Sequence, residues 1–253
     1  MQTNIGSDSS KIVARLSVNS VSKSFAGQVA LDSVSFEVHE HEMLAVLGPS
    51  GAGKTTLFRC ITGLLAPDKG TVKVAGLDVS GLRGRERRHV AVVFQQFNLV
   101  NRLSALDNVL AGRLGYVSSW RAWARRFTSA DRLLAMECLD RVGLVDKANQ
   151  RADTLSGGQQ QRVAIARALA QQPDIIIADE PIASLDPNIS AEILDLLRGI
   201  CHSDGLSVVC SLHQVDFART YADRLIGLAK GKLLVDLPAA QFDQAAADRL
   251  YCS

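Results

Sequence analysis

The stretch MLAVLGPSGAGKTTLFRC, residues 43–60, decides the fold of this chain. Its first five residues are all apolar, and GPSGAGKT, residues 48–55, matches the pattern G-x-x-x-x-G-K-[ST]. A buried strand, a glycine-rich loop and a helix, predicted here over residues 54–64, together surround phosphate oxygens with backbone N–H groups and the positive end of a helix dipole. The stretch therefore predicts a phosphate-binding loop within an α/β fold.

The residue types of this loop suit phosphate chemistry. Glycines let the backbone turn its N–H groups inward, Lys54 would neutralise charge on the β- and γ-phosphates, and the Thr55 hydroxyl would bind Mg²⁺. A purely structural turn would need no lysine followed by a hydroxyl residue. The predicted nucleotide-binding residues of the loop are Gly48, Pro49, Ser50, Gly51, Ala52, Gly53, Lys54, Thr55 and Thr56.

Further apolar strands followed by helices continue the pattern. Residues 175–178 precede a helical segment at 191–200, and residues 207–211 precede one at 215–221. Strands that are hydrophobic on both faces and joined by helices indicate a parallel sheet covered on both sides. Residues 14–38 instead alternate apolar and polar positions, which predicts antiparallel strands with one wet face.

Composition and charge exclude several classes of protein. Of the 253 residues, 47% are hydrophobic and 21% are charged, which is ordinary for a folded domain and excludes a disordered chain. The 28 basic residues nearly balance the 26 acidic ones, so no nucleic-acid partner is expected. No apolar run approaches the roughly 20 residues that cross a bilayer. The polar N-terminus lacks the pattern of a secretory signal, so a cytoplasmic protein is expected.

The cysteines are scattered and form no CxxC pair. An odd number of them in a cytosolic chain favours reduced packing residues over disulfides or zinc ligands. This prediction covers Cys60, Cys138, Cys201, Cys210 and Cys252.

Two acids end the apolar strand that begins at residue 175. Asp179 and Glu180 would lie at the carboxyl edge of the sheet, where open α/β folds bind ligands. There Asp179 would hold Mg²⁺, directly or through water, and Glu180 would orient or deprotonate the attacking water. Taken alone, the two acids could equally end a strand in solvent.

The motif LSGGQ at residues 155–159 makes the chain resemble the ATPase subunits of ATP-binding cassette (ABC) transporters. The phosphate loop, LSGGQ, the strand ending in two acids, Ser184-Leu185-Asp186 and His213 occur in that family's order and spacing. The resemblance implies a single domain with a P-loop NTPase core, a mostly parallel sheet, an N-terminal antiparallel β region and a helical subdomain inserted in the core. The implied core covers about residues 10–96 and 164–236, the helical subdomain about 97–163 and a C-terminal tail about 237–253.

Patterning within the inserted region and the tail agrees with this reading. Residues 97–163 contain no comparable strand, and the tail, from residue 238, is expected to hold a short strand exit and an alanine-rich helix. Apolar residues recur at helical spacing in the insertion, at Leu133, Leu134, Met136, Leu139 and Val142.

The resemblance also implies a second subunit. Ser156 and the two glycines after it begin a predicted helix over residues 159–170, which offers N–H groups and its dipole to an anion. In the family this anion is the γ-phosphate of ATP held by the other subunit, so two ATP molecules are sandwiched in a head-to-tail homodimer. The residues with this role are Ser156, Gly157, Gly158 and Gln159.

The resemblance completes the catalytic set. Gln95, after a strand at residues 90–94, resembles the glutamine that senses Mg²⁺ and the attacking water, with Gln96 as the alternative. His213 resembles the histidine that contacts the γ-phosphate. The implied catalytic residues are Glu180, His213 and Gln95, and the implied metal-binding residues are Thr55, Gln95 and Asp179.

Two further residues have a functional and a structural interpretation. By the same resemblance, Phe25 stands at the position where the family has an aromatic ring against adenine. The alternative is that Phe25 is a core residue. Asp186 would align the two subunits at the dimer interface, or it caps the helix that follows it.

Several phrases resemble the ATPase subunits of phosphonate importers, among them FQQFNLV, GRLGY, QRADT and EPIAS at residues 94–100, 112–116, 150–154 and 180–184. This implies an ATP-hydrolysing subunit on the cytoplasmic face of the inner membrane, working with membrane permease subunits and a periplasmic or surface substrate-binding protein. The alternatives are an importer of another solute, such as phosphate esters or phosphite, and a lipoprotein-release system. A soluble ABC ATPase acting on DNA or ribosomes is disfavoured by the absence of sustained heptads.

Two surface segments have open interpretations. Residues 116–127 contain Trp120 and Trp123 among arginines, which suggests a docking surface for the membrane subunit or lipid, or a solvated helix with its tryptophans partly in the core. The basic run is interpreted as a solvated helix face, or as a contact to membrane headgroups, and consists of Arg83, Arg85, Arg87 and Arg88.

Overall fold

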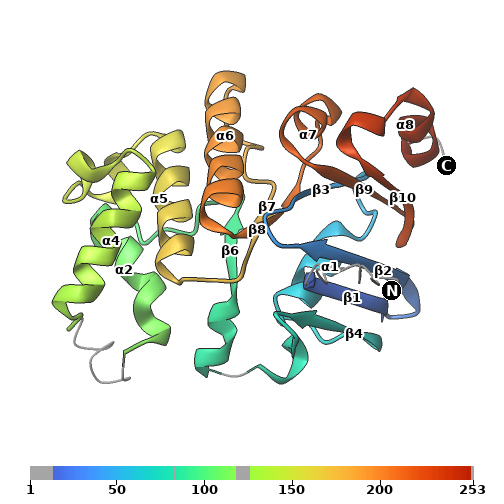
Figure 1. Ribbon diagram of the computed structural model, residues 1–253, viewed down its shortest axis with the longest axis horizontal. Helices are drawn as coiled ribbons and strands as arrows, with labels where there is room; N and C mark the ends of the chain where they lie inside the picture. The colour runs from blue at the N-terminus through green and yellow to red at the C-terminus, as the bar shows by residue number, and fades with distance from the viewer. Residues whose placement is uncertain (1–13, 83, 118–125, 252–253) are drawn as a thin grey trace, which may run out of the picture.

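The computed structural model describes residues 14–82, 84–117 and 126–251, and its strands there form two sheets (Figure 1). The larger sheet has the order β10-β9-β3-β8-β7-β6, in which β9 and β10 pair antiparallel and the other neighbours pair parallel. This confirms a mostly parallel sheet. Its strands are β3 (Met43–Leu47), β6 (Val90–Phe94), β7 (Ile175–Asp179), β8 (Ser207–Ser211), β9 (Arg224–Ala229) and β10 (Lys232–Pro238).

The smaller sheet is the predicted N-terminal antiparallel region. Its order is β2-β1-β4-β5, and alternate residues of β1 (Leu16, Val18 and Val21) are fully buried. The sequence pattern indicated the first two strands but not the last two. The four strands are β1 (Ala14–Phe25), β2 (Gln28–His39), β4 (Lys69–Val74) and β5 (Leu77–Asp78).

The central strand β3 contributes to both sides of the fold because all five of its residues are buried. Leu44 and Val46 pack into a core with α1 and the antiparallel sheet. Met43, Ala45 and Leu47 point the other way, into a core formed with the remaining helices. Such a strand can lie only in the middle of a covered sheet, which fixes the position of the loop that follows it.

Three helices gather at one end of the molecule. Figure 1 shows α2, α4 and α5 together at one end of the molecule, and they belong to the segment inserted between β6 and β7. We call this group the helical lobe. The α-helices are α1 (Lys54–Ile61), α2 (Ala105–Leu110), α4 (Ser129–Arg141), α5 (Gly157–Ala170), α6 (Pro187–Asp204), α7 (Val215–Tyr221) and α8 (Gln244–Tyr251). The 3₁₀-helices are η1 (Val79–Gly81), η2 (Gly84–His89), η3 (Ala111–Gly115), η4 (Val145–Lys147), η5 (Ala152–Thr154) and η6 (Ala239–Gln241).

Several predicted boundaries were wrong. Helix α1 ends three residues early because Gly63 adopts a φ of +67°. Helix α6 is longer at both ends than residues 191–200, since Asp186 caps its start and Gly205 ends it at a φ of +73°. The expected strand exit of the tail is the end of β10, whereas α8 confirms the alanine-rich helix. Leu133 is 62% exposed, so not every apolar position of α4 faces the core.

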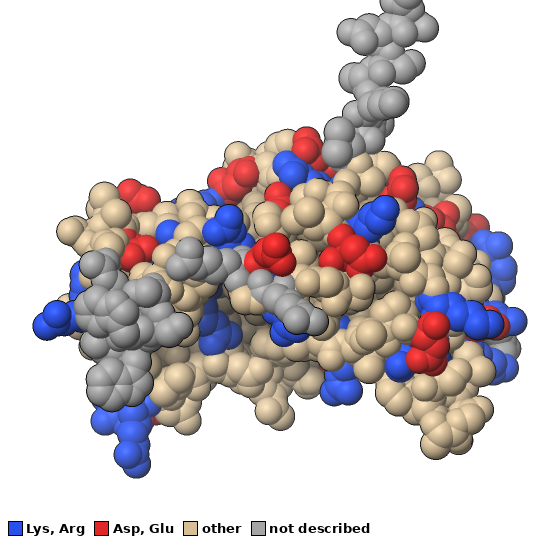
Figure 2. Space-filling view, turned by 90° about the horizontal axis from the view of Figure 1, so that it is seen from below, with Lys and Arg blue, Asp and Glu red and all other residues tan. Residues whose placement is uncertain are grey.

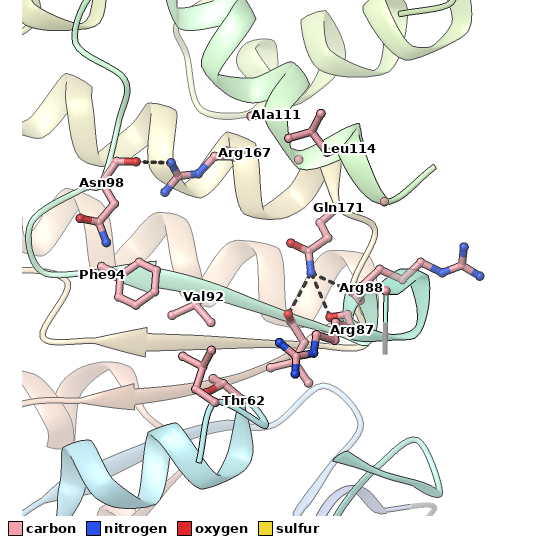
Figure 3. Close-up of a pocket in the computed structure, with 15 residues that line it drawn as sticks. Thr62, Arg87, Arg88, Val92, Phe94, Asn98, Ala111, Leu114, Arg167 and Gln171 are labelled. Atoms are coloured by element: carbon pink, nitrogen blue, oxygen red, sulfur yellow. Dashed lines mark hydrogen bonds between the residues drawn. The ribbon is translucent and has the colours of Figure 1, made fainter. Parts of the chain in front are cut away.

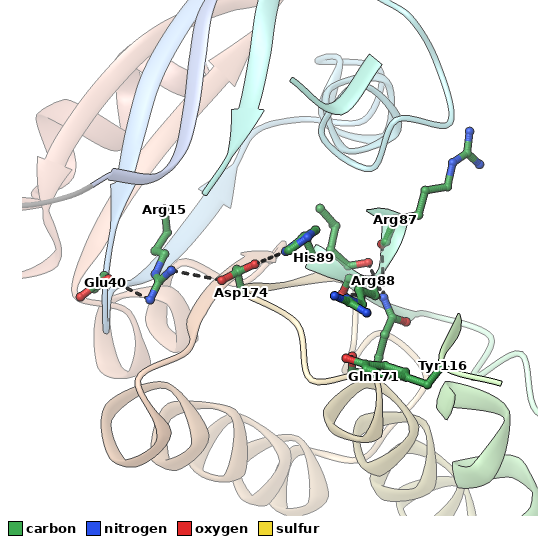
Figure 4. Close-up of polar contacts among 9 residues, drawn as sticks. Arg15, Glu40, Arg87, Arg88, His89, Tyr116, Gln171 and Asp174 are labelled. Atoms are coloured by element: carbon green, nitrogen blue, oxygen red, sulfur yellow. Dashed lines mark hydrogen bonds and ion pairs between the residues drawn. The ribbon is translucent and has the colours of Figure 1, made fainter. Parts of the chain in front are cut away.

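A chain of ion pairs and hydrogen bonds joins the antiparallel sheet to the parallel strands (Figure 4). Arg15 of β1 contacts Glu40 at 2.8 Å and donates from Nη1 to Asp174 Oδ1 at 3.1 Å. On its other oxygen, Asp174 contacts His89 Nδ1 at 2.5 Å. Because Asp174 and His89 directly precede β7 and β6, these contacts fix the starts of two strands whose ends bear predicted site residues.

The cysteines of the described part of the chain act as packing residues. Cys60, Cys138, Cys201 and Cys210 are buried and free, as predicted. Burial raises the pKa of the Cys60 and Cys138 thiols to about 11, so both stay protonated at neutral pH.

The basic run forms the 3₁₀-helix η2. Arg87 is exposed, as predicted, but Arg88 is half-buried with its guanidinium 4.9 Å from the ring centroid of Tyr116. On the face shown in Figure 2, basic and acidic side chains are interspersed. Outside the described residues lie Trp120, Trp123, Cys252, Arg83 and the side chain of Arg85. None of the described helices is both long enough and apolar enough to span a membrane.

Candidate functional site

The phosphate loop connects β3 to α1 and requires glycine at two positions. Gly48 has a φ of +149°, and a Cβ atom there would collide with the backbone oxygen of Leu228 in β9. Gly53 has a φ of +108°, and its Cβ would lie 2.5 Å from the backbone oxygen of Ala30 in β2. Any other residue would force these segments apart. The loop is therefore held closely between two strands.

Lys54, the first residue of α1, is a buried cation beside this loop. Its side chain donates from Nζ to the backbone oxygens of Gly48 at 2.6 Å and Pro49 at 3.2 Å. Burial lowers the pKa of Lys54, and the negative charges of Glu180 and Asp179 oppose that effect. Two neutral carbonyls do not compensate a positive charge as an anion does. The loop is thus suited to a phosphate group.

The two acids at the end of β7 are held by one hydroxyl of the neighbouring strand. Ser211, the last residue of β8, donates to Asp179 Oδ1 at 2.9 Å and accepts the backbone N–H of Glu180 at 2.8 Å. Burial raises the pKa of Asp179, although the hydrogen bond from Ser211 opposes the shift. The structure therefore does not place Asp179 simply in solvent.

Glu180 and His213 meet beside the loop. The Oε1 atom of Glu180 lies 2.5 Å from Nε2 of His213. Both residues border a cavity of about 420 Å³ whose other walls come from β2 and the phosphate loop. Seven predicted residues of the phosphate loop thus share one cavity with Glu180 and His213, which come from distant parts of the sequence. The residues that line it are Ala30, Ser50, Gly51, Ala52, Gly53, Lys54, Thr55, Thr56, Glu180 and His213.

The LSGGQ motif lies elsewhere, at the start of α5 in the helical lobe (Figure 1). Ser156 is exposed and caps the helix: its Oγ accepts the backbone N–H of Gln159 at 3.4 Å, and Gln159 Oε1 accepts the N–H of Ser156 at 3.0 Å. Gly157 is exposed as well, whereas Gly158 packs closely on Ile189. None of these residues lines the cavity described above. A single chain therefore does not bring the phosphate loop and LSGGQ together.

Other predicted residues also lie outside the lining of that cavity, among them Gly48, Pro49 and Asp179, which adjoin it in the chain. Gln95 and Gln96 are both exposed in the turn after β6, so their surroundings do not distinguish them. Phe25 is 47% exposed at the end of β1, and the alternative of a core residue was wrong. Asp186 caps α6 by accepting the N–H of Ile189 at 3.1 Å, which confirms the capping interpretation. Its role at a dimer interface stays a prediction.

Sequence reasoning missed Ser211. The residue ends a strand that reads as wholly structural, and nothing local shows that β8 lies beside β7 in the sheet. The signal that could have found it is its place two residues before His213, at the carboxyl edge where ligands bind.

A second cavity, of about 450 Å³, lies between β6 and the helical lobe (Figure 3). We call it the interlobe groove. Two side chains of the α5 segment reach across it: Arg167 donates to backbone oxygens of the loop after β6, and Gln171 donates to the Val90 oxygen at 2.8 Å. Its lining includes Leu64 and Leu114, which are 61% and 47% exposed. The groove is thus lined both by the helical lobe and by the part of the molecule that contains the parallel sheet.

The sequence matches the family described as ABC transporter over residues 31–183. It is 47% identical to the hypophosphite import ATP-binding protein HtxD of Stutzerimonas stutzeri, across 93% of this chain and 70% of that protein. It is also 47% identical to the phosphonates import ATP-binding protein PhnC of Escherichia coli (strain K12), across 93% of this chain and 94% of that protein. It is 50% identical to the phosphonates import ATP-binding protein PhnC of Nitratidesulfovibrio vulgaris, across 86% of this chain and 84% of that protein.

Solved structures show the same fold. The ATP-binding cassette MJ0796, a dimer bound to ADP and Pi, aligns with a TM-score of 0.76 and 34% identity over 90% of this chain and all of that one. The ATP-binding cassette MJ1267 in its ADP conformation aligns with a TM-score of 0.83 and 26% identity over 93% of this chain and 96% of that one. The chain therefore belongs to the ABC transporter family, of which it is an ATPase domain.

Proposed function

We propose that this chain is the ATP-hydrolysing subunit of a membrane importer for phosphonates. The separation of two half-sites carries the ATPase part of the proposal, and the 47–50% identity to phosphonates import ATP-binding proteins supports the solute. The phosphate loop, Glu180 and His213 surround one cavity, while LSGGQ is exposed on the helical lobe. Two copies arranged head to tail would complete two ATP sites, each with the loop of one copy and Ser156 of the other. The dimeric form of the MJ0796 cassette supports this arrangement.

Each residue of the site then has a chemical task. Lys54 and the backbone of the loop hold the β- and γ-phosphates, and the exposed ring of Phe25 lies against adenine. Glu180 accepts a proton from the attacking water, and His213, already in contact with it, orients that carboxylate and contacts the γ-phosphate. Closure of the two copies would exclude bulk water from the reacting phosphate and keep the attacking water in place.

The oxygen atoms beside the loop suit Mg²⁺, which prefers carboxylate, hydroxyl and phosphate oxygens. The Thr55 side chain borders the cavity, and Asp179 lies close enough to Lys54 to influence its pKa. Because burial raises the pKa of Asp179, a bound cation would favour the ionised form. When present, Mg²⁺ would neutralise phosphate charge. Gln95 is the third proposed ligand, from the turn after β6.

Membrane permease subunits would dock at the interlobe groove. Both parts of the molecule line it, so a partner bound there would respond to any change in their relative position. Exposed Leu64 and Leu114 offer apolar contacts. The segment with Trp120 and Trp123 remains a second predicted docking surface. Through these contacts the chain acts on the cytoplasmic face of the inner membrane.

Selection of the solute is assigned to other subunits. A separate periplasmic or surface protein would bind the phosphonate and deliver it to the permease. Hypophosphite is the second candidate, because its import protein in Stutzerimonas stutzeri is as similar in identity as the Escherichia coli phosphonate protein. The chain covers 70% of the former and 94% of the latter, which favours phosphonates.

Growth of a host that lacks this chain tests the proposal. The sole phosphorus source would be a small phosphonate, hypophosphite or, as a control, phosphate, and the strain would carry the wild type or Lys54→Ala. We expect the wild type, but not the variant, to restore growth on phosphonate. Growth restored on hypophosphite but not on phosphonate would make hypophosphite the substrate. Equal growth with the wild type and with Lys54→Ala would contradict ATP-driven uptake.

A further inference from the structure

Gln161 connects the helix that starts at LSGGQ to the catalytic acid. It is fully buried in α5 and donates from Nε2 to the backbone oxygen of Pro181 at 2.7 Å. Pro181 directly follows Glu180, and Ser156 caps the same α5 helix. One side chain therefore links the helix that begins at the motif for the partner's ATP to the peptide that follows the acid for this chain's own ATP.

The backbone at Glu180 needs to be held. Glu180 has a φ of +50°, a region that residues with a Cβ rarely adopt and keep only where their surroundings impose it. On one side, Ser211 Oγ accepts the Glu180 N–H at 2.8 Å. On the other side, Pro181 has no N–H; the Glu180 oxygen accepts the Ala183 N–H at 3.3 Å, and the Pro181 oxygen accepts the Gln161 side chain at 2.7 Å.

Packing does not account for a glutamine at this position. The Oε1 atom of Gln161 is buried and has no hydrogen-bond partner among the described residues. A buried acceptor without a partner destabilises the folded state, whereas methionine, of similar length, has no such atom. The feature that only the glutamine supplies is the N–H donated to Pro181.

We propose that Gln161 is a positioning residue that holds Glu180 in its reactive conformation and transmits the position of α5 to it. The inference rests on the proposed two-copy ATPase. ATP of the partner copy would engage Ser156 at the start of α5, and any shift of that helix would move the Gln161 amide and the peptide at Pro181. Occupation of one ATP site would thereby adjust the carboxylate that serves the other.

Steady-state kinetics of the purified full-length chain with Gln161→Met test this role. We expect kcat to fall about tenfold, the KM for ATP to stay within about twofold, and the cooperativity of ATP hydrolysis to decrease. The midpoint of chemical unfolding should stay close to that of the wild type, because the variant removes one unpaired acceptor, Gln161 Oε1, while it leaves the Pro181 oxygen without its donor. Gln150→Met is the matched control, since Gln150 donates to Thr154 within the helical lobe, and it should leave the kinetics unchanged.

The Gln161→Glu variant supplies a second readout. An ionised glutamate cannot donate to the Pro181 oxygen, but a protonated one can, and burial raises the pKa of such a group. We expect the turnover of this variant relative to the wild type to increase as pH falls from about 8 to about 6. A ratio that does not change with pH would contradict the role of the donated hydrogen bond.

Glu180→Gln, measured in parallel, separates this inference from the function on which it rests. Normal turnover of Glu180→Gln would overturn the proposed catalytic site itself. If Glu180→Gln loses turnover while Gln161→Met keeps wild-type kcat and cooperativity, the role of Gln161 alone is wrong. A Gln161→Met variant that loses stability and turnover together, without the pH-dependent recovery of Gln161→Glu, would reduce Gln161 to a packing residue.

Discussion

The Nε2 atom of His213 lies 2.5 Å from the Oε1 atom of Glu180, at the ends of two strands that are neighbours in the sheet. This contact leaves the second carboxylate oxygen of Glu180 available to a water molecule. Glu180→Gln keeps the shape of the side chain but removes the base. We expect its kcat for ATP to fall by about a hundredfold or more, with ATP binding retained, measured by turnover and nucleotide-binding assays. Loss of ATP binding would indicate a structural role instead.

The ionised Asp179 carboxylate should make the folded chain less stable at neutral pH. Burial raises its pKa, so the folded chain binds the proton more tightly than the unfolded chain, and stability from this group decreases as pH rises through the raised pKa. Asp179→Asn removes the penalty. Without Mg²⁺ and ATP, its thermal midpoint should exceed that of the wild type at pH 7, and the difference should shrink toward about pH 4. Its ATP turnover should be lost. A lower midpoint at pH 7 would contradict this account.

Two glycine-to-alanine substitutions should have opposite effects on stability. A Cβ at Gly158 would lie 2.6 Å from Cγ2 of Ile189, a stiff side chain, so Gly158→Ala should lower the free energy of unfolding by about 1–3 kcal/mol. Gly199 lies on the exposed face of α6, and a Cβ atom there would meet nothing within 4 Å. Gly199→Ala should therefore raise the free energy of unfolding by about 0.5–1 kcal/mol, because alanine has the higher helix propensity. Chemical denaturation measures both, and equal effects would show that the α5–α6 contact is loose.

The helical lobe depends on a buried ion pair. Arg113 donates to Asp131 at 2.9 Å, and a second nitrogen donates to the Ala170 oxygen at 3.0 Å, which joins η3, α4 and α5. Arg113→Leu leaves the Asp131 charge buried without its partner, so we expect a loss of about 3 kcal/mol in chemical unfolding. Adding Asp131→Leu should restore part of that loss. A double variant that is less stable than the single one would mean that the pair matters chiefly for its other hydrogen bonds.

The sequence predicted the parts of the site that are local. The phosphate loop could be identified because strand, glycines, lysine and helix follow one another without interruption from Met43 to Ile61. The acids at the end of β7 and the cap at Ser156 are also readable, since each depends on residues that are close in the chain.

Other features depend on strand order, which the sequence does not display. Ser211 holds Asp179 and Glu180 only because β8 lies next to β7, and β3 lies between β8 and β9. The antiparallel partners β4 and β10 have mixed exposed and buried residues, so their patterns are weak. Gln161 looks like a polar position of a helix until its contact with Pro181 is known.

The mass of the Glu180→Gln chain in solution, with and without ATP and Mg²⁺, tests the central claim most directly. If the phosphate loop of one copy and Ser156 of another enclose ATP, the nucleotide should convert a monomer into a particle of twice the mass that retains one ATP per chain. Ser156→Arg, added to the same chain, should prevent this by blocking the contact. A chain that binds ATP fully and stays monomeric would contradict the two-copy site.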